Sequence, residues 1–544
     1  PDRGVFHLFS DTNATTCLGP PSAADYAGMA PRHKFLVNDV DTEEYRDYYR
    51  RHGCPEHGSQ GATLLLPSTG SAFTPSQCPC NMANAFAKRH MANTPTPQPY
   101  PPDQNTDDPT HFPLAAAWYS TFHGAVKTEY WERISTYQLT WIAKWPALKI
   151  AAIAASVWTD RISFTKVKAF VKRERGGKRP TKGRGIQGLY SFVTQWIISP
   201  FTTAYQKACC AVFGPDSDER NGIKMTIGSG MTNDDIRHWV SAGQAAMQGA
   251  GEVFAVFEDD STNFDSSMGA AHNEMYHPML KYVDPRYLFS YIRASRFVVS
   301  TFRYLKKGWN IIIKAKIDDT QKSGQPDTTI ANGLKCGGAH VEAGLRYREK
   351  QKDDIRQILD EHRVPYTHLD NNGMLALVQN YVSKTFVMLR MWILVNGDDT
   401  ICLTNCPDAG AFIFAELGKM GLRIKGNVFR SLQNARFCSG YFYKFSGQYY
   451  FGCKIGRLLR NFGWTVRPPS AKKRAAHIRG LIACLSQSMG GFPIVKEFLA
   501  AASEHHFGIP TALDTDFGDP RKDCFNSDNY ALHNVYTCKI PVVR

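Results

Sequence analysis

The sequence predicts a mixed α+β fold in which a small sheet is assembled from strands that lie far apart along the chain. Apolar runs with the length and composition of strands occur at residues 252–260, 390–404 and 436–459. Between them, residues 408–421 repeat apolar side chains at helical spacing and end at a glycine. Beyond Pro469 the pattern again predicts helices, and no internal repeat interrupts it.

Composition narrows the class of protein. The chain has 544 residues, 43% of them hydrophobic, which is typical of globular proteins and excludes disordered and fibrous folds. The most apolar segment, residues 141–158, contains Lys144, Pro146 and Lys149 and is not expected to span a membrane. The first residues do not resemble a secretory signal, so the chain is not expected to be secreted. The initial proline indicates a processed or trimmed chain. The 14 cysteines have no framework spacing, which favours a reducing compartment.

Positive charge is concentrated in one stretch. The formal net charge is +15, and residues 166–184 hold nine Lys or Arg against one acidic residue. Like charges repel unless a partner neutralises them, so this block predicts binding to a polyanion or to phosphates. A solvated basic tail is the alternative interpretation.

Residues 1–110 differ from the rest of the chain, because they are rich in small polar residues and end in a proline-rich stretch. This composition predicts an extended arm or linker without a large core of its own. The arm contains five residues of the types that bind zinc, namely Cys54, His57, Cys78, Cys80 and His90. Their spacings match no regular zinc module, so scattered buried thiols are expected in preference to a metal site.

Acidic residues follow two of the predicted strands. Asp260 ends the first and precedes Asp265 by five positions, while Asp398 and Asp399 lie in a turn that follows Gly397. Carboxylates at the ends of neighbouring strands can share divalent ions, which align a hydroxyl with a leaving pyrophosphate. Either acidic motif alone would be weak evidence for catalysis, because a lone GDD is usually a surface turn.

A third motif lies between these strands, where Ser323, Gly324, Thr328 and Asn332 have the spacing S-G-x3-T-x3-N. Ser-Gly predicts a flexible loop, and Thr328 and Asn332 are one turn apart on the helix that follows. Hydroxyl and amide groups placed there would suit recognition of a ribose. An N-capped helix would explain one of the four residues but not all of them.

Taken in order, these motifs resemble those of the RNA-dependent RNA polymerases of positive-strand RNA viruses, with the tombusvirus, nodavirus and flavivirus-like groups nearest. The resemblance covers residues 165–500 and rests on the basic stretch at 170–188, D-x4-D at Asp260 and Asp265, the Ser-Gly motif, GDD at 397–399, a helix followed by Lys425, and RFCSG around Cys438. In the basic stretch, Lys172, Glu174, Arg184 and Ile186 match.

The resemblance implies a right hand made of fingers, palm and thumb. It places an N-terminal extension at 1–110, fingers at 111–250 and 271–321, a palm with a small antiparallel sheet at 251–270 and 322–450, and a helical thumb at 451–544. It also implies RNA-directed RNA synthesis from NTPs by a two-metal-ion mechanism, replicating a positive-strand viral genome. The implied partners are template and product RNA, NTPs, other viral replication proteins and, through them, host membranes, at replication sites in the host cytoplasm.

By the same resemblance, each site residue receives a role. Asp260 and Asp398 would hold two Mg²⁺ ions, with Mn²⁺ as an alternative, and Asp399 would be a weaker ligand. The ribose 2′-hydroxyl would be read by Asp265 and Asn332, within a nucleotide-binding group that also includes Ser323, Gly324 and Thr328. Lys172 and Arg184 would bind the triphosphate, since metals and cationic side chains stabilise phosphoryl transfer.

The sequence departs from the family pattern in three places. Asp260 follows two other acidic residues, so only the D-x4-D spacing selects it, and Asp259 is the reserve candidate. The interval before GDD is long, and residues 346–373 are predicted to fill it with a charged helical excursion on the surface. Either Lys419 or Lys425 would serve as the general acid, and Lys425 is preferred because this group must reach the pyrophosphate from a mobile loop.

Two other functions compete with this interpretation. A reverse transcriptase would have a similar sheet and metals, but a polymerase that makes DNA fills the position beside the sugar with a bulky side chain, where this chain has Asp265 and Asn332. A non-catalytic RNA-binding scaffold would not need the acidic residues. For Asp265 alone, an N-cap of the helix at 266–275 is the structural alternative.

Overall fold

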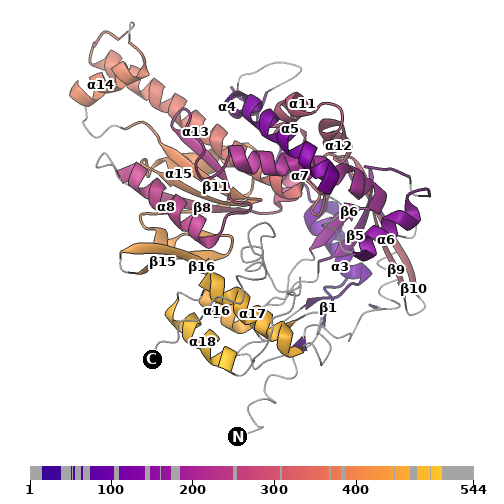
Figure 1. Cartoon of the computed structure of the whole chain (residues 1–544). Coiled ribbons are helices and arrows are strands. Elements are labelled where there is room, and N and C mark those ends of the chain that lie inside the picture. Colours follow the sequence, from indigo (N-terminus) through magenta and orange to yellow (C-terminus); the bar gives the residue numbers. More distant parts are fainter. Residues whose placement is uncertain are drawn as a thin grey trace.

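Helices, two five-stranded sheets and three smaller sheets make up the described part of the fold, which is mixed α and β as the sequence predicts. The structure is a computed structural model that describes residues 15–37, 51, 53–54, 63–64, 74–102, 110–140, 147–159, 161–172, 184–248, 254–306, 309–366, 369–381, 387–445, 447–462, 464–465, 474–489 and 492–504. Figure 1 shows the two sheets on opposite sides of the molecule, with long helices above and between them.

The first of these sheets, here called the central sheet, has the strand order β13-β8-β12-β11-β7. Its strands are β7 (Ile223–Ile227), β8 (Ala255–Ser261), β11 (Met391–Asn396), β12 (Asp399–Thr404) and β13 (Ile424–Phe429). All neighbours are antiparallel except β11 and β7, which are parallel. The strands predicted at 252–260 and 390–404 are confirmed, whereas β7 comes from the segment expected to form fingers and lies instead at the edge of this sheet.

A tight turn joins β11 to β12. Asn396 pairs directly with Asp399, so only Gly397 and Asp398 form the turn. Gly397 has a φ of 69°, the left-handed conformation that two-residue hairpin turns require and that glycine adopts without strain. The turn therefore places Asp398 at the very end of the sheet.

Helices cover one face of the central sheet. The long helix α13 (Thr328–Glu361) packs across β7 and β11, beside α4 (Pro113–Ser120) and α15 (Ala409–Lys419). A methyl group at Gly337 of α13 would overlap the side chain of Met225, so a glycine there lets helix and sheet approach closely. The opposite face carries α8 (Asn233–Gln248), whose Trp239 packs against the sheet.

The charged excursion is confirmed as helical. The second half of α13 extends beyond the sheet to α14 (Asn371–Tyr381), at the upper left of Figure 1. A small apolar cluster fastens α14 to α13, and its buried members are Ile355, Leu359, Met374 and Val378.

The second sheet has the strand order β2-β10-β9-β5-β6. Its strands are β2 (Lys34–Val37), β5 (Lys166–Val171), β6 (Gly185–Leu189), β9 (Val298–Lys306) and β10 (Trp309–Ile317). Next to it, α5 (His123–Thr140) packs against α7 (Phe192–Val212).

The N-terminal region is more than the predicted arm. Every residue of α3 (Pro79–Ala85) is buried, and the π-helical turn η2 (Phe86–His90) continues it. Met82 and Phe86 belong to the main core, and α3 contacts β5, β9 and β10. The described part of this region therefore shares the core of the second sheet, because its apolar side chains have no core of their own to fill.

The C-terminal region begins with a small sheet of β14 (Arg436–Phe437), β15 (Gly440–Phe445) and β16 (Gln448–Cys453). Three helices follow, α16 (Ile455–Asn461), α17 (Arg474–Met489) and α18 (Pro493–Glu504), the last two as predicted. The strand predicted to reach residue 459 is too long, because α16 occupies its end. Its leucines, among them the buried Leu458, join the core of α17 and α18 at helical spacing.

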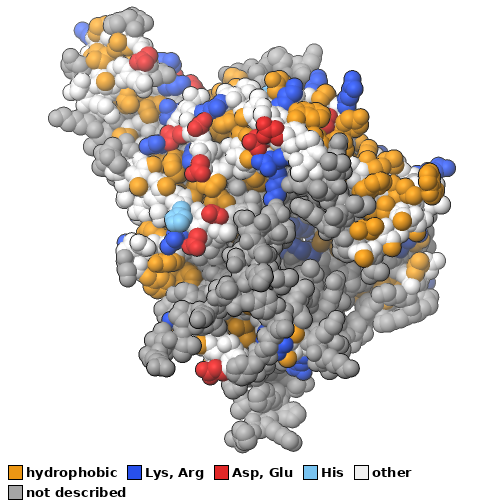
Figure 2. Space-filling view, viewed as in Figure 1, with side chains coloured by type: hydrophobic (Ala, Val, Ile, Leu, Met, Phe, Trp, Pro, Cys, Tyr) orange, Lys and Arg blue, Asp and Glu red, His pale blue; other side chains and the backbone are white. Residues whose placement is uncertain are grey.

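Apolar side chains gather on one side of the surface. Figure 2 shows them near α6 (Ala147–Ser156), β9 and β10, and exposed members include Phe170, Val299 and Leu305. None of the described helices is both long and apolar enough to cross a membrane.

One buried ion pair ties β8 to α13. His340 Nε2 lies 2.7 Å from Asp259 Oδ2, and both side chains are almost fully buried. Burial alone would lower the pKa of His340, but the Asp259 carboxylate raises it well above its usual value. The raised pKa keeps His340 protonated, so it forms an ion pair with Asp259 inside the core.

Replacing His340 by Ala should lower the free energy of unfolding by about 3–5 kcal/mol, because it leaves the Asp259 carboxylate buried without a partner. Urea denaturation measures this loss. The control is His362→Ala at the exposed end of α13, which should change stability little. Equal losses in the two variants would show that the pair contributes nothing specific.

Candidate active site

The central sheet brings three of the predicted catalytic acids to one end. Asp260 lies near the end of β8, and β12 pairs Thr400 with Asp259, so Asp399 adjoins Asp260 across the sheet. Asp398 occupies the turn just before Asp399. Carboxylates that are 138 positions apart in sequence therefore meet at one end of the sheet, as the sequence predicts, and this group is called the acidic cleft below.

The electrostatics of this cleft follow from that convergence. Burial, then the neighbouring Asp398 and Asp260, raise the pKa of Asp399 to about 7. Burial and the charge of Asp265 raise the pKa of Asp398 as well, while the guanidinium of Arg89 opposes this shift. Crowded like charges disfavour ionisation, and a bound cation would relieve their repulsion. An all-oxygen group of this kind suits Mg²⁺ or Mn²⁺.

Side chains alternate along β8, so Asp260 and the reserve candidate Asp259 lie on opposite faces of this strand. Asp259 points into the core toward His340, whereas Asp260 is exposed on the opposite face of β8. A carboxylate committed to a buried histidine is a structural group. The structure therefore supports the choice of Asp260 that the D-x4-D spacing suggested.

Asp265 joins the Ser-Gly motif through its carboxylate. Ser323 Oγ donates to Asp265 Oδ2, and Asn332 Nδ2 donates to Asp265 Oδ1 at 3.0 Å. The N-cap alternative is wrong, because Asp265 lies within the short helix α9 (Phe264–Ser267), whose N-cap is Asn263. The sequence prediction that Asp265, Ser323 and Asn332 lie together is confirmed.

Asn332 has one further property that bears on recognition. Its Oδ1 is buried and, among the described residues, has no hydrogen-bond partner. Because the Asn332 side-chain nitrogen donates to Asp265, the group that this side chain can offer a ligand is its oxygen, which is a hydrogen-bond acceptor. A buried acceptor without a partner carries a free-energy cost that a ligand hydroxyl would remove.

Gly324 has a conformation that only glycine adopts easily, with a φ of 96°. A methyl group there would overlap the Cγ2 atom of Ile186 in β6. The neighbouring Ser323 carbonyl accepts a hydrogen bond of 2.6 Å from the backbone N–H of Gln187. The Ser-Gly loop is therefore docked on the strand that follows Arg184.

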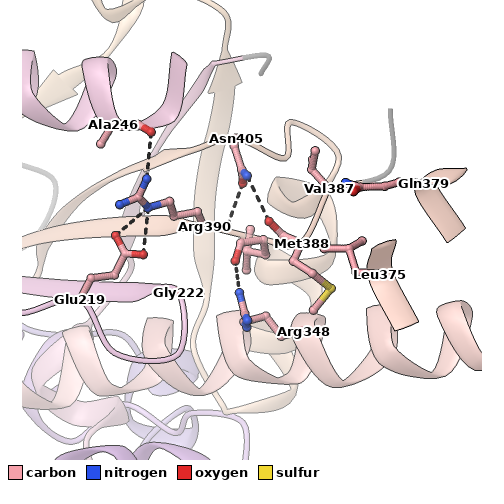
Figure 3. A pocket seen from close by; sticks show the side chains of 11 residues that line it. Glu219, Gly222, Ala246, Arg348, Leu375, Gln379, Val387, Met388, Arg390 and Asn405 are labelled. Carbon is pink, nitrogen blue, oxygen red and sulfur yellow. Dashed lines mark hydrogen bonds and ion pairs between the residues drawn. The ribbon is translucent and has the colours of Figure 1, made fainter. Parts of the chain in front are cut away.

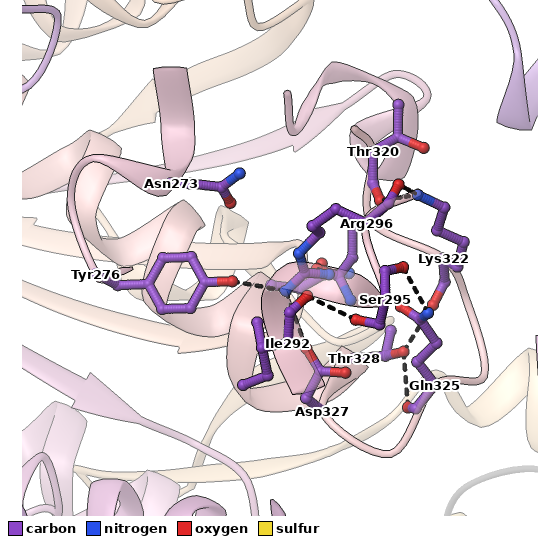
Figure 4. Close-up of polar contacts among 12 residues, drawn as sticks. Asn273, Tyr276, Ile292, Ser295, Arg296, Thr320, Lys322, Gln325, Asp327 and Thr328 are labelled. Carbon is purple, nitrogen blue, oxygen red and sulfur yellow. Dashed lines mark hydrogen bonds and ion pairs between the residues drawn. The ribbon is translucent and has the colours of Figure 1, made fainter. Parts of the chain in front are cut away.

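A buried polar network supports the same loop from behind (Figure 4). Arg296 Nη2 donates to Asp327 Oδ2 at 3.0 Å and to the Tyr276 hydroxyl at 2.6 Å. The Thr328 hydroxyl faces the loop carbonyls of Lys322 and Gln325, at 2.8 Å from each. Thr328, predicted to contact the nucleotide, thus holds the shape of the loop in this structure.

The basic stretch is described at its two ends. The backbone N–H of Lys172 donates to the carbonyl of Arg184 at 2.7 Å, which closes the β5–β6 hairpin. Residues 173–183, which include Glu174 and most of the basic block, lie outside the described residues. The hairpin places Lys172 and Arg184 together, next to the strand on which the Ser-Gly loop docks.

The two candidate lysines have different surroundings. Lys425 lies in β13 directly opposite Asp260 in the register, so its side chain shares the face of that carboxylate. Lys419 Nζ lies 2.6 Å from Glu416 Oε1 on α15, where the same glutamate also binds Arg346. These contacts favour Lys425, although it lies on a strand and not, as the sequence suggested, on a loop.

Arg89 was not found from the sequence, and Cys438 was noted there only as part of the RFCSG motif. Arg89 of η2 lies 4.0 Å from Asp265 Oδ2, and it comes from the region expected to be an arm. Cys438, in the predicted grip hairpin, accepts a hydrogen bond of 3.4 Å from Asn396 and also lowers the pKa of Asp399. No local motif marks Arg89, because only the burial of α3 brings it to the cleft.

A separate pocket lies at the far end of β11 (Figure 3). Its charged groups already have partners, since Arg390 binds Glu219 at 2.7 Å and Arg348 donates to the carbonyl of Leu389. Because these charged side chains are already paired, they do not point together into the pocket as catalytic groups would. The acidic cleft remains the candidate site.

Comparison of the chain with known protein families and with curated proteins finds no match. The functional argument therefore rests on the geometry of the cleft and on the motifs themselves.

Replacing Gly324 by Ala should lower the free energy of unfolding by about 1–3 kcal/mol, through its positive φ and its overlap with Ile186. Thermal or urea unfolding measures the loss, and adding Ile186→Ala should recover part of it. The control is Gly418→Ala in α15, where the new methyl group meets no atom and should be neutral or stabilising by up to ~1 kcal/mol. A neutral Gly324→Ala variant would contradict the docking of the loop.

Proposed function

We propose that the protein is an RNA-directed RNA polymerase that adds nucleotides from NTPs to the 3′-hydroxyl of an RNA chain, replicating a positive-strand viral genome. One observation carries the proposal: the acidic cleft of Asp260, Asp398 and Asp399 lies beside Asp265, whose carboxylate binds Ser323 and Asn332. In this proposal the central sheet is the palm, the second sheet with its helices belongs to the fingers, and α16–α18 form the thumb of a right hand.

The metal requirement follows from the crowded carboxylates. Mg²⁺, or Mn²⁺ in its place, would be held by Asp260, Asp398 and Asp399 and would activate the 3′-hydroxyl and stabilise the leaving pyrophosphate. Burial and the neighbouring Asp398 and Asp260 raise the pKa of Asp399 to about 7, and a bound cation would favour its ionised form. Asp259 does not take part, because His340 holds it in the core.

The sugar would be read by the Asp265 group. A ribose 2′-hydroxyl can donate to Asn332 Oδ1, the buried acceptor that has no other described partner, while Ser323 and the Asn332 amide fix the Asp265 carboxylate beside it. A deoxyribose would leave that acceptor unpaired, which favours RNA synthesis over DNA synthesis. This argues against the reverse transcriptase.

Basic side chains would serve the triphosphate. Lys172 and Arg184 stand at the base of the basic hairpin, and positive groups there stabilise negative charge on phosphate oxygens. Lys425 shares a face with Asp260, within reach of a leaving group held there, and its ammonium would donate a proton to the pyrophosphate oxygen. RNA, other replication proteins and cytoplasmic replication sites on host membranes complete the proposal. A non-catalytic scaffold would have no use for these groups.

Either Asp260→Asn or Asp398→Asn should reduce nucleotide addition by a hundredfold or more, on the order expected for lost transition-state stabilisation. Primer extension with labelled NTPs and Mg²⁺ measures the rate. Melting temperature and RNA affinity should stay close to those of the unchanged protein, since each change removes a repelled charge. The exposed Asp353→Asn on α13 is the matched control. Activity above about a tenth in the Asp398→Asn protein would exclude the assignment.

Asn332→Ala and Asp265→Asn should lower the ratio of rNTP to dNTP incorporation efficiency by about 10- to 100-fold, the loss expected when a selective hydrogen bond disappears. Single-nucleotide incorporation kinetics give the ratio, with Asp353→Ala as control. Some polymerisation should survive in both variants. If the ratio is unchanged and only the melting temperature falls, the group has a structural role.

A further inference from the structure

Four cysteine sulfur atoms meet in the N-terminal region, where scattered thiols were expected. Cys17, Cys54, Cys78 and Cys80 have sulfur atoms that all lie within 4.8 Å of one another. Of the zinc-type residues considered from the sequence, His57 lies outside the described residues. His90 is buried elsewhere, beside Gly185. The expectation is therefore wrong for this cluster, and its fourth member, Cys17, was not among the candidates.

The spacing of the sulfur atoms fits one tetrahedral ion. A Zn–S bond of about 2.3 Å places the sulfur atoms of a tetrahedral site about 3.8 Å apart. Cys17 Sγ and Cys78 Sγ are 3.7 Å apart, which is far longer than a disulfide bond of about 2.05 Å. In a [4Fe–4S] cluster each thiolate binds a different iron, and in a [2Fe–2S] cluster two thiolates bind each of two irons, so four cysteine sulfur atoms cannot all stand as close together as they do around a single ion.

Hydrogen-bond donors surround the sulfur atoms. The backbone N–H groups of Gly19 and Asn81 point at Cys17 Sγ and Cys78 Sγ, each at 3.4 Å. The Ser76 hydroxyl donates to Cys78 Sγ at 3.0 Å. Donors directed at sulfur stabilise a thiolate more than a neutral thiol, and such contacts orient metal ligands. Cys78 and Cys80 are fully buried, where thiolate charge needs a metal partner.

We propose that Cys17, Cys54, Cys78 and Cys80 bind one structural Zn²⁺ ion. The ion would join three stretches of chain that are far apart in the sequence: the end of β1 (Thr15–Thr16), the segment at 53–54 and the start of α3. Strand β1 pairs in parallel with β4 (Thr74–Pro75), just before the two later cysteines. The side chains of Asn81 and Asn84 also bind the backbone at Leu18 and Gly19.

The position of this site gives it a structural consequence. Cys78 is the N-cap of α3, and α3 continues into η2, which carries Arg89 to the carboxylate of Asp265. Gln77, next to Cys78, accepts from the backbone N–H of Val171 at 3.2 Å, at the base of the basic hairpin. The zinc ion would thus anchor the helix that reaches the acidic cleft. Zinc binding itself does not depend on the proposed polymerase activity.

Metal analysis of the full chain, purified without chelator, tests the proposal. We expect about one zinc ion per chain. Cys54→Ser and Cys80→Ser should lose most of it, and Cys54→His, which keeps a zinc ligand, should retain more than Cys54→Ser. The control is Cys210→Ala in α7, which should keep the full content because this cysteine lies outside the cluster.

A second measurement uses only the unchanged protein, so that it stands even if a variant fails to fold. The four cysteines should resist alkylation until a strong chelator is added, and added zinc should restore their protection. Iron in place of zinc, a mass deficit that reveals disulfides, or four thiols that alkylate at once without a chelator would each overturn the proposal. None of these results would depend on RNA synthesis.

Discussion

The carboxylates of Asp260, Asp398, Asp399 and Asp265 lie close together at one end of the central sheet, where burial and the neighbouring negative charges raise the pKa values of Asp398 and Asp399. Such a group is stable only if the surrounding chain supplies positive charge, hydrogen-bond donors or bound cations. Arg89 lies beside Asp265, and Ser323 and Asn332 donate to its two oxygens. The other three carboxylates crowd together, and oxygen ligands of this kind are why we propose a divalent ion as their partner.

The sequence predicted most of what lies on the central sheet, because strand-end acids and the Ser-Gly motif leave local signals. It could not choose between Asp259 and Asp260 by composition, since adjacent acids look alike in a sequence. The choice depends on which face of β8 meets His340, a residue 81 positions away. It also did not predict the pairing of β7 with β11, because parallel pairing is a long-range contact that no local turn indicates.

The N-terminal region was the least predictable part for a related reason. Its proline-rich end and small polar residues are typical of an arm, and that composition conceals a short helix whose every residue is buried. Neither Arg89 at the cleft nor Cys17 in the cysteine cluster belongs to a motif. Their positions are fixed only when α3 packs into the core of the second sheet, an event that involves residues more than 200 positions away.

Helix α13 has a mechanical consequence that follows from its length. Its 34 residues form one continuous rod of about 50 Å, with Asn332 near one end and the attachment of α14 near the other. If one end of such a helix tilts, the other end tilts with it, because the helix bends little. A molecule bound at the α14 end would therefore act on the far end of the same helix, where Asn332 contacts Asp265.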